Sequence, residues 1–548
     1  MTTLLFPGRH LLNTAYQENY LHNLVDRQLD TLSWWEGKAP ASAEPLEQIV
    51  FAITSRNQAN SRYNPIPFHV RAIGLDRLAR RLKRSFGLRY RIIGIPHYAP
   101  TSRFAEHVLQ EIEEQTEGNL VLTPENCVVL CSTEPVMALF QDLGFSILTA
   151  ELTDHTQPDT PIELLKKFVA VGEGWTADPE LQSKLSKATF ELWHDFPDVP
   201  RRILRLWRDP LLNDEGSLTD SRDYASYAYL MGNSEIITLK YQDIHQAIVP
   251  GKIVDEGCGD GALLVPIARD FPDSDLIGIE ITGEFIARGL ERQRAGEFGG
   301  TFVHFHQRNI TQPIFEAGSI DTTICNSTVH ELWSYGQQEQ TVRDYFALKY
   351  DQTRKNGRLL IRDVVGPENK MQEVYLWLND QDGRHDNIFA QFDNREALMA
   401  YLNGLSTYGR FLRFARDFLA DMRKSGQRGP ETAVQYHEET IEGQRYIVLT
   451  LKDAVEFMTK KDYTNNWDSE MNEEFAFWDF NEWKGALETA GFQIVENPNR
   501  PQAGSRAYVN PWIVKNRWEG KVKLYRMADG RLKEMTYPVT NIVLVGEK

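Results

Sequence analysis

Hydrophobic and polar positions change in blocks along the chain, and the blocks predict strands that are each followed by a helix. Short apolar runs open residues 49–82 and 127–152, and each run gives way to a longer segment with helical spacing. The same order recurs in residues 253–282, and residues 359–365 predict a further strand. Strands that alternate with helices form parallel sheets, so the pattern predicts an α/β protein.

The most informative segment is residues 253–264, where two carboxylates and three alternate glycines separate a strand from a helix. Alternate glycines let the backbone turn sharply and leave bare peptide for a ligand. The next predicted strand, residues 275–282, carries Glu280 near its end. Ligands of open parallel sheets bind where such loops leave the carboxyl ends of strands. The loop residues of interest are Asp255, Glu256, Gly257, Gly259 and Gly261.

The spacing of this loop narrows the choice of ligand. A dinucleotide loop has the spacing G-x-G-x-x-G and holds a pyrophosphate, whereas this loop has G-x-G-x-G after two carboxylates. Carboxylates repel phosphate and suit an ammonium group. Loop, helix and Glu280 together resemble motif I and the following acidic motif of class I S-adenosylmethionine (SAM)-dependent methyltransferases. The alternative is an ordinary turn between a strand and a helix.

This resemblance covers residues 246–365 and 480–548, and it implies a SAM site. Glu280 is expected to accept the ribose hydroxyls, Asn309 to pair with the adenine edge, and Ile310 to stack on the ring. The predicted cofactor-binding residues are Asp255, Glu256, Gly257, Cys258, Gly259, Gly261, Glu280, Asn309, Ile310 and Asn326.

His330 and Glu331 are the predicted catalytic residues, because they follow the strand whose end faces the sulfonium in this fold. Methyl transfer needs an aligned acceptor and a group that takes its proton, and a histidine has a suitable pKa. The alternative is that His330 caps or packs against the next helix. An insertion, residues 366–480, is expected to form a lid over the acceptor or a plain packing subdomain. Within it, Trp467, Glu470 and Glu473 have the spacing of one helical face and would shape the acceptor pocket or cap a surface helix.

Residues 1–175 have their own alternation of strands and helices and resemble the nucleotidyltransferase superfamily, closest to nicotinamide-nucleotide adenylyltransferases. The family places H/T-x-G-H at its first helix, whereas here Tyr16 and Gln17 replace the glycine and the histidine. Glutamine carries no positive charge, so the resemblance implies nucleotide binding without fast nucleotidyl transfer. The predicted nucleotide-binding residues are Gly8, Arg9, Thr14, Gln17, Ser55, Asn64 and Arg71.

A basic segment, residues 71–91, and a helical segment, residues 176–245, complete the picture. The basic segment predicts either a site for a phosphate-bearing substrate or a solvated helix face paired with acidic neighbours. The helical segment predicts a linker that includes a lid helix at residues 223–233 before the glycine loop.

Composition restricts the function classes further. The chain has 548 residues and a net charge of -17, which argues against nucleic acid and anionic membranes as partners. We find no apolar run of membrane-spanning length, no signal peptide and no metal-ligand spacing, and the four cysteines are expected to be reduced thiols. A cytoplasmic protein is therefore expected.

The sequence thus predicts two Rossmann-like modules, with SAM-dependent methyl transfer to a small polar or phosphate-bearing acceptor. A nucleotide with Mg²⁺ in the first module stays an open alternative. A regulatory sensor of nucleotide and SAM, and an RNA methyltransferase, are the competing functions. The predicted domains are a HUP-type nucleotidyltransferase-like domain at 1–175, a helical linker and lid at 176–245, and a class I methyltransferase sheet at 246–548 with a helical insertion at 366–480.

Overall fold

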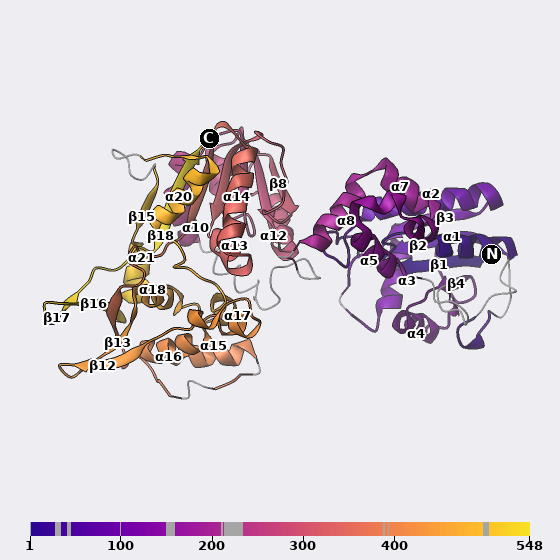
Figure 1. Ribbon diagram of the computed structural model, residues 1–548. Coiled ribbons are helices and arrows are strands. Elements are labelled where there is room, and N and C mark those ends of the chain that lie inside the picture. The colour runs from indigo at the N-terminus through magenta and orange to yellow at the C-terminus, as the bar shows by residue number, and fades with distance from the viewer. Residues whose placement is uncertain are drawn as a thin grey trace. The chain divides into compact units, whose positions relative to one another are not determined.

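The computed structural model divides into two compact units, Met1–Gly216 and Ser217–Lys548 (Figure 1). The predicted lid helix at residues 223–233 lies outside the described residues. Within the described part of the chain, no helix combines the length and the apolar character needed to cross a bilayer. None of the four cysteines forms a disulfide, and all four are buried. The structure describes residues 2–27, 34–40, 45–98, 100–149, 159–209, 212, 234–386, 390–392, 394–496 and 504–548.

The first unit is built on a five-stranded sheet in the order β3-β2-β1-β4-β5. All neighbouring strands are parallel, and their apolar residues are buried on both faces, as expected for a parallel sheet covered by helices. This confirms the predicted α/β character of the unit. The strands are β1 (Thr2–Gly8), β2 (Leu46–Ile53), β3 (Arg89–Gly94), β4 (Cys127–Leu130) and β5 (Ser146–Leu148).

Helices cover both faces of this sheet. α1 (Ala15–Arg27) and α2 (Phe68–Phe86) bury leucines against one face, and α3 (Phe104–Gln115) and α4 (Glu134–Asp142) bury apolar residues against the other. A third core joins later helices to the loop after β1, so much of the predicted linker belongs to the first unit. These later helices are α5 (Pro161–Val171), α6 (Pro179–Lys184), α7 (Lys187–Asp195) and α8 (Asp198–Arg208).

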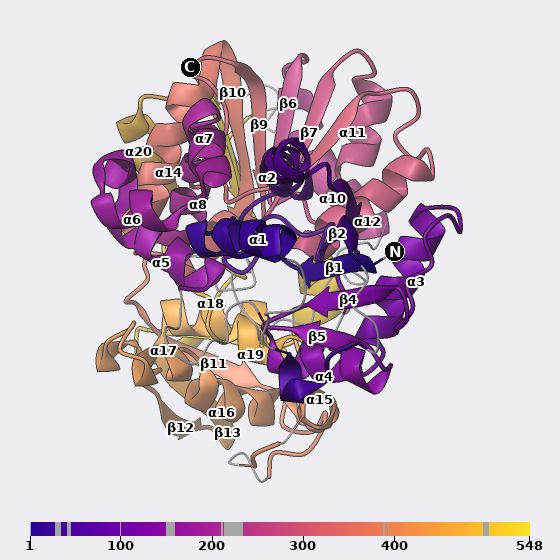
Figure 2. The ribbon, with the colours of Figure 1, turned by 90° about the vertical axis from the view of Figure 1, so that its right-hand side faces the viewer.

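The second unit contains a sheet in the order β14-β18-β10-β9-β6-β7-β8, and Figure 2 shows β10, β9, β6 and β7 side by side. The last five strands of this order are parallel, whereas β18 runs antiparallel between β10 and β14. β15 (Arg506–Tyr508) also pairs with β18. The strands are β6 (Lys252–Glu256), β7 (Asp275–Glu280), β8 (Val303–Gln307), β9 (Ile320–Asn326), β10 (Thr353–Val364), β14 (Gln493–Ile494) and β18 (Asn541–Glu547).

In the described part of the second unit, six helices flank this sheet. α14 and α20 pack against each other, and α11 buries Leu264 and Ile267 in a core shared with the strands. The glycine loop leads from β6 into α11, and β9 leads into the short helix α13. The helices are α10 (Ser234–Ile244), α11 (Leu264–Asp270), α12 (Gly283–Arg294), α13 (Val329–Tyr335), α14 (Glu339–Gln352) and α20 (Phe480–Ala490).

The insertion is not only helical, which corrects the sequence prediction. It contains an antiparallel sheet in the order β12-β13-β11-β16-β17, and the last two strands come from residues 522–534, well after the predicted insertion. The prediction assigned this hairpin to the end of the methyltransferase sheet, because a sequence pattern does not reveal which distant strand a hairpin joins. The strands are β11 (Glu373–Leu378), β12 (His437–Ile441), β13 (Gln444–Thr450), β16 (Val522–Ala528) and β17 (Arg531–Glu534).

Helices of the insertion share one apolar core with this sheet. α16, α18 and β11 contribute Phe411, Phe457 and Leu376, which are fully buried, and Trp518 joins them from the later segment. The two separated stretches of chain therefore fold as one body. The helices are α15 (Arg395–Asn403), α16 (Thr407–Asp417), α17 (Ala420–Lys424), α18 (Leu451–Lys460) and α19 (Trp467–Glu470).

Candidate SAM pocket and its surroundings

The three alternate glycines of the loop after β6 all have positive φ angles, of 74°, 54° and 78°. A Cβ at Gly257 would lie 2.3 Å from Thr328 Oγ1, and a Cβ at Gly261 would lie 2.6 Å from the Phe305 ring. A Cβ at Gly259 would meet nothing within 4 Å. Gly257 and Gly261 therefore permit close packing, whereas Gly259 borders open space.

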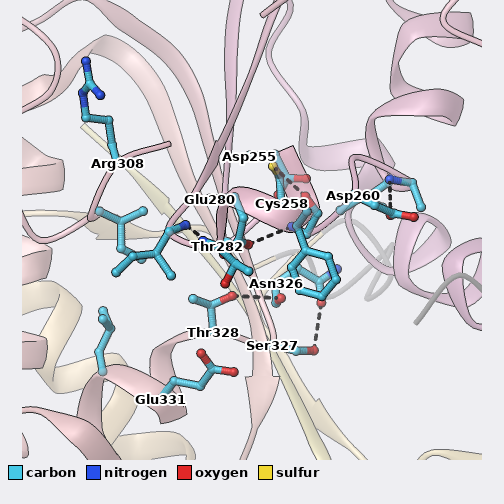
Figure 3. A pocket seen from close by; sticks show the side chains of 18 of the residues that line it. Asp255, Cys258, Asp260, Glu280, Thr282, Arg308, Asn326, Ser327, Thr328 and Glu331 are labelled. Atoms are coloured by element: carbon cyan, nitrogen blue, oxygen red, sulfur yellow. Dashed lines mark hydrogen bonds between the residues drawn. The ribbon is translucent and has the colours of Figure 1, made fainter. Parts of the chain in front are cut away.

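That space is a pocket at the carboxyl ends of β6, β7 and β9 (Figure 3). It encloses about 1170 Å³, a volume that includes the solvent in its open mouth. Of the predicted site residues, nine line it: Asp255, Gly257, Cys258, Gly259, Glu280, Asn309, Ile310, Asn326 and Glu331.

Glu280 is held at the pocket by backbone donors. Its Oε2 accepts a hydrogen bond from the N–H of Gly259 at 3.0 Å, and its Oε1 accepts from Ile281 and Thr282 at 2.8 and 2.9 Å. Burial raises the pKa of Glu280, while these hydrogen bonds act against the rise. The carboxylate is thus fixed in position at the end of β7, where the prediction expected it.

Asp255 is a buried carboxylate with a free acceptor atom. Its side chain is 2% exposed, and burial raises its pKa to about 7, although Lys240 of α10 lowers it. Burial also lowers the pKa of Lys240 to about 8. Among the described residues, Asp255 Oδ2 has no hydrogen-bond partner. A buried acceptor without a partner is costly, so this end of the pocket suits a ligand that carries a donor.

The polar side chains at β8 and β9 are partly committed to local hydrogen bonds. Asn309 Oδ1 accepts from the backbone N–H and the hydroxyl of Thr311, at 3.0 and 2.9 Å. Asn326 Oδ1 accepts from the Ser327 hydroxyl at 3.1 Å. Asn326 Nδ2 is buried and has no acceptor within the described part of the chain. A polar ligand could therefore donate to Asp255 Oδ2 and accept from Asn326 Nδ2.

Glu256 and Gly261, which were also predicted to bind the cofactor, are not among the residues that line the pocket. Successive residues of a strand point to opposite faces, so Asp255 and Glu256 cannot both face the same ligand. Glu256 is fully buried on the other face, where it accepts from Lys349 Nζ at 2.6 Å and from the Tyr345 hydroxyl at 2.7 Å. It therefore ties β6 to α14.

His330, which precedes Glu331 in the chain, is not among the residues that line the pocket. Its Nδ1 is 2.6 Å from Asp363 Oδ1, and its Nε2 is 3.4 Å from Glu473 Oε2. Burial alone would lower the pKa of His330, but the carboxylates of Asp363 and Glu473 raise it well above its ordinary value. Both ring nitrogens of His330 already face a carboxylate, so this position does not favour the predicted role of general base.

Glu331 is the predicted catalytic residue that does reach the pocket. Figure 3 shows its carboxylate below Thr328, at the opposite end of the pocket from Asp255. Tyr335, one turn further along α13, also lines the pocket and donates a hydrogen bond to Glu473 Oε1 at 3.2 Å. This end of the pocket is therefore formed by α13, which contacts the insertion through Tyr335 and Glu473.

The insertion supplies one of its three predicted acceptor residues to this end. Glu473 contacts His330 and Tyr335, as described above. Trp467 is buried in the insertion core and donates from Nε1 to Asp417 Oδ2 at 3.0 Å, so its position is that of a packing residue. Glu470 is buried as well, and neither it nor Trp467 lines the pocket.

Several lining residues were not singled out from the sequence. They come from loops and helix ends around the predicted positions, and Ile237 and Lys240 come from α10, which precedes the glycine loop. Only tertiary packing brings α10 to the pocket, so no local pattern identifies them. The additional residues are Ile237, Lys240, Asp260, Ala262, Leu263, Ile281, Thr282, Phe285, Arg308, Ser327, Thr328, Leu332 and Tyr335.

In the first unit, Arg71 connects the loops that follow β1 and β2. Its guanidinium donates to the carbonyl oxygens of Arg9, Thr54 and Ser55 at 2.6, 2.8 and 2.9 Å, and the side chain is 2% exposed. Ser55 has a φ of 55° and its hydroxyl lies 3.0 Å from His97 Nδ1. Arg71 thus stabilises the two loops from within, while Ser55 and His97 meet at the carboxyl edge of the sheet.

The other predicted residues of this unit make local contacts. Thr14 and Gln17 form a reciprocal cap of α1: the Gln17 N–H donates to Thr14 Oγ1 at 3.0 Å, and the Thr14 N–H donates to Gln17 Oε1 at 3.2 Å. Asn64 Nδ2 donates to Gln58 at 2.9 Å, and Arg9 donates to the Tyr63 carbonyl at 3.1 Å. Gly8 is the last residue of β1.

The basic segment after residue 71 forms ion pairs, as the alternative prediction proposed. Arg77 pairs with Asp195, Arg80 with Asp76, and Arg81 with both Glu18 and Glu191. Arg89 pairs with Glu47. These contacts favour a solvated helix face over a phosphate site.

Comparisons with known proteins find similarity to methyltransferases. Residues 250–403 match a family model described as a methyltransferase domain. A SAM-dependent methyltransferase from Mesorhizobium loti is 13% identical, with 58% of this chain and 100% of that chain covered and a TM-score of 0.30. One from Clostridium acetobutylicum ATCC 824 is 10% identical, with 60% and 99% covered and a TM-score of 0.29.

A third solved structure, of SAM-dependent methyltransferases from Methanosarcina mazei, is 12% identical, with 55% and 95% covered and a TM-score of 0.27. The search of curated proteins returned no match. The matched residues 250–403 contain the glycine loop, Glu280 and Glu331. Over residues 250–403 the second unit is therefore similar to a methyltransferase domain.

Proposed function

We propose that SAM binds in the pocket between Asp255 and Glu331, with its ammonium group at Asp255 and its ribose at Glu280. The observation that carries this proposal concerns two buried polar atoms of the pocket lining, Asp255 Oδ2 and Asn326 Nδ2, which have no partner among the described residues. The amino-acid part of SAM has an ammonium group, which would donate to Asp255 Oδ2. It also has a carboxylate, which would accept from Asn326 Nδ2. The open space beside Gly259 leaves room for the ligand against bare backbone.

We also propose that the methyl acceptor is a small polar molecule that enters at the α13 end of the pocket. Bound SAM supplies a methyl group on a sulfonium, and transfer moves the methyl to an oxygen or nitrogen of the acceptor while the acceptor loses a proton. Glu331 is the carboxylate at this end, so it orients the O–H or N–H of the acceptor and takes up the proton. His330 acts through its neighbours as a positioning residue for α13.

Glu331→Gln tests this division of roles. The substitution keeps the size of the side chain and removes its charge, so SAM affinity measured by calorimetry should stay within about twofold of wild type. Release of S-adenosylhomocysteine with a panel of small hydroxyl and amine acceptors should fall by ~10²–10⁴. Glu339→Gln, an exposed residue paired with Arg343 on α14, is the matched control and should turn over like wild type. Unchanged turnover in Glu331→Gln would contradict the assigned role.

For the first unit we infer a nucleotide-binding function at the carboxyl ends of β1 and β2. The parallel sheet and the loops joined by Arg71 support this, because such loop edges present backbone N–H groups to phosphate. Titration of the protein with nucleoside triphosphates and Mg²⁺ tests it, with little release of pyrophosphate expected because Gln17 carries no charge. Arg9→Ala should weaken binding, and Arg80→Ala, on α2, should not. The inference fails if no nucleotide binds.

A further inference from the structure

The cluster behind the acceptor end of the pocket brings together side chains that the sequence separates by 142 positions. One nitrogen of His330 and one oxygen each of Glu331 and Glu473 lie within 4.8 Å of one another. His330 and Glu473 are buried, whereas Glu331 is half-buried and lines the pocket. The cluster is therefore enclosed on one side and reachable from the pocket on the other.

The surroundings of the cluster match those of a metal site. Metal-binding histidines donate their second ring N–H to a carboxylate, which fixes the ring, and ligating carboxylates are themselves hydrogen-bonded. Here Nδ1 of His330 is 2.6 Å from Asp363, so Nε2 faces the cluster. Glu473 Oε1 accepts from the hydroxyls of Tyr335 and Ser469 at 3.2 and 3.4 Å, which leaves Oε2 on the side of His330.

The negative charge of the cluster also favours a bound cation. Three carboxylates, of Asp363, Glu331 and Glu473, surround one imidazole, and two of them are almost fully buried. Two described cationic side chains beside this region, Arg428 and Lys460, form ion pairs with other carboxylates. Arg428 pairs with Glu474 at 2.9 Å, and Lys460 pairs with Glu456. An excess of buried negative charge is unfavourable without a compensating cation.

We propose that His330, Glu331 and Glu473 bind a divalent cation at the acceptor end of the pocket. One nitrogen and two carboxylate oxygens suit Mn²⁺ or Zn²⁺ better than Ca²⁺ or Mg²⁺, which prefer oxygen ligands alone. The role of the ion rests on the proposed function: it holds an oxygen atom of the acceptor beside the methyl group, and so selects acceptors with a hydroxyl group. Glu331 has two oxygens, so one binds the ion while the other faces the acceptor.

The sequence predicted no metal, because it contains no local spacing of ligands. His330 and Glu331 are adjacent, and the third ligand comes from the insertion through the packing of the segment after α19 against α13. The insertion therefore completes the proposed site, which gives it a role beyond that of a cover.

Titration of the full-length protein with Mn²⁺ after dialysis against a chelator tests the proposal directly. We expect one ion per chain by calorimetry and by elemental analysis, and at least ~10-fold weaker binding in Glu331→Gln and Glu473→Gln. Zn²⁺ is titrated in the same way. Because the Glu331 side chain is only half-buried, Glu331→Gln is the variant that should fold even if Glu473→Gln does not. Circular dichroism checks the folding of each variant.

Two control variants and one further titration make the result decisive. His304→Gln removes an exposed histidine that stacks on His306, and Glu339→Gln removes an exposed carboxylate, so both should bind Mn²⁺ like wild type. The absence of one-to-one binding of either metal, or wild-type affinity in a folded Glu331→Gln protein, would overturn the proposal. SAM is titrated into the same metal-free protein: SAM binding without metal binding rejects the metal site alone, and metal binding without SAM binding rejects the proposed function alone.

Discussion

Substitution of Gly259 by alanine is the most discriminating perturbation of the proposed SAM pocket. The N–H of this residue donates to Glu280, and its φ is 54°, in the left-handed region. A Cβ here would have no protein atom within 4 Å and would project into the pocket. Gly259→Ala therefore leaves the protein's own packing intact and occupies space that the proposed ligand needs.

The magnitude follows from two separate costs. An alanine in the left-handed region costs ~1–2 kcal/mol of folding stability. Crowding a well-packed contact by one methyl group costs ~1–3 kcal/mol, which corresponds to SAM binding weakened about 5- to 150-fold. Gly299→Ala is the matched control, because Gly299 has a φ of 60°, also has nothing within 4 Å of its Cβ, and does not line the pocket.

Calorimetric titration of SAM into the three proteins separates the two costs. Both variants should lose similar stability in thermal unfolding, and only Gly259→Ala should lose SAM affinity. Wild-type SAM affinity in a folded Gly259→Ala protein would refute the reasoning, and so would an equal loss of affinity in Gly299→Ala.

Three further predictions concern buried charges. Asp255→Asn should weaken SAM binding and raise the free energy of unfolding. The folded-state pKa of Asp255, about 7, exceeds the unfolded value of 3.8, so the stability of the wild type falls as pH rises from about 4 to 7. In urea unfolding, the variant's gain in unfolding free energy over wild type should be near zero at pH 4 and grow to at most ~4 kcal/mol above pH 7. A gain independent of pH would contradict this. Lys349→Met should cost ~3–5 kcal/mol by leaving Glu256 buried and unpaired, and Glu256→Leu in the same chain should recover much of that loss in urea unfolding. Arg71→Ala should lower the unfolding free energy by ~3 kcal/mol, because three carbonyl oxygens lose a charged donor, and a change below ~1 kcal/mol would show that the two loops hold together without it.

Local sequence patterns were enough to predict the core of the pocket. The glycine spacing and Glu280 are features of one short stretch of chain, and strand–loop–helix order dictates that they meet at one sheet edge. Asp255, Asn309, Ile310 and Asn326 were expected from the resemblance to class I methyltransferases, and all of them line the pocket. The parallel sheet was predictable for the same reason.

The errors arose where a position depends on side-chain direction or on distant chain segments. Glu256 was predicted to face the ligand, but strand alternation turns it toward Lys349, which lies 93 positions later. Thr14 and Gln17 have a T-x-x-Q spacing that is also typical of a helix cap, and they cap α1; their role in nucleotide binding stays a prediction. Glu473 meets His330 only because the insertion packs against α13.

The His330 prediction shows how burial changes the chemistry of a residue. The sequence suggested an imidazole near its ordinary pKa at the end of β9. The structure places carboxylates at both ring nitrogens, so neither nitrogen faces the pocket and the side chain is buried. Neither neighbour is close to His330 in the sequence, so no local pattern reveals the environment. We therefore propose Glu331, and not His330, as the residue next to the acceptor.

The central claim is that SAM occupies the pocket between Asp255 and Glu331. A crystal structure of the chain with S-adenosylhomocysteine tests it most directly. The account predicts the ammonium group within hydrogen-bond distance of Asp255 Oδ2, the ribose hydroxyls at Glu280 and the sulfur directed toward Glu331. Electron density for the ligand at another site, or a ligand in this pocket whose ribose does not contact Glu280, would contradict it.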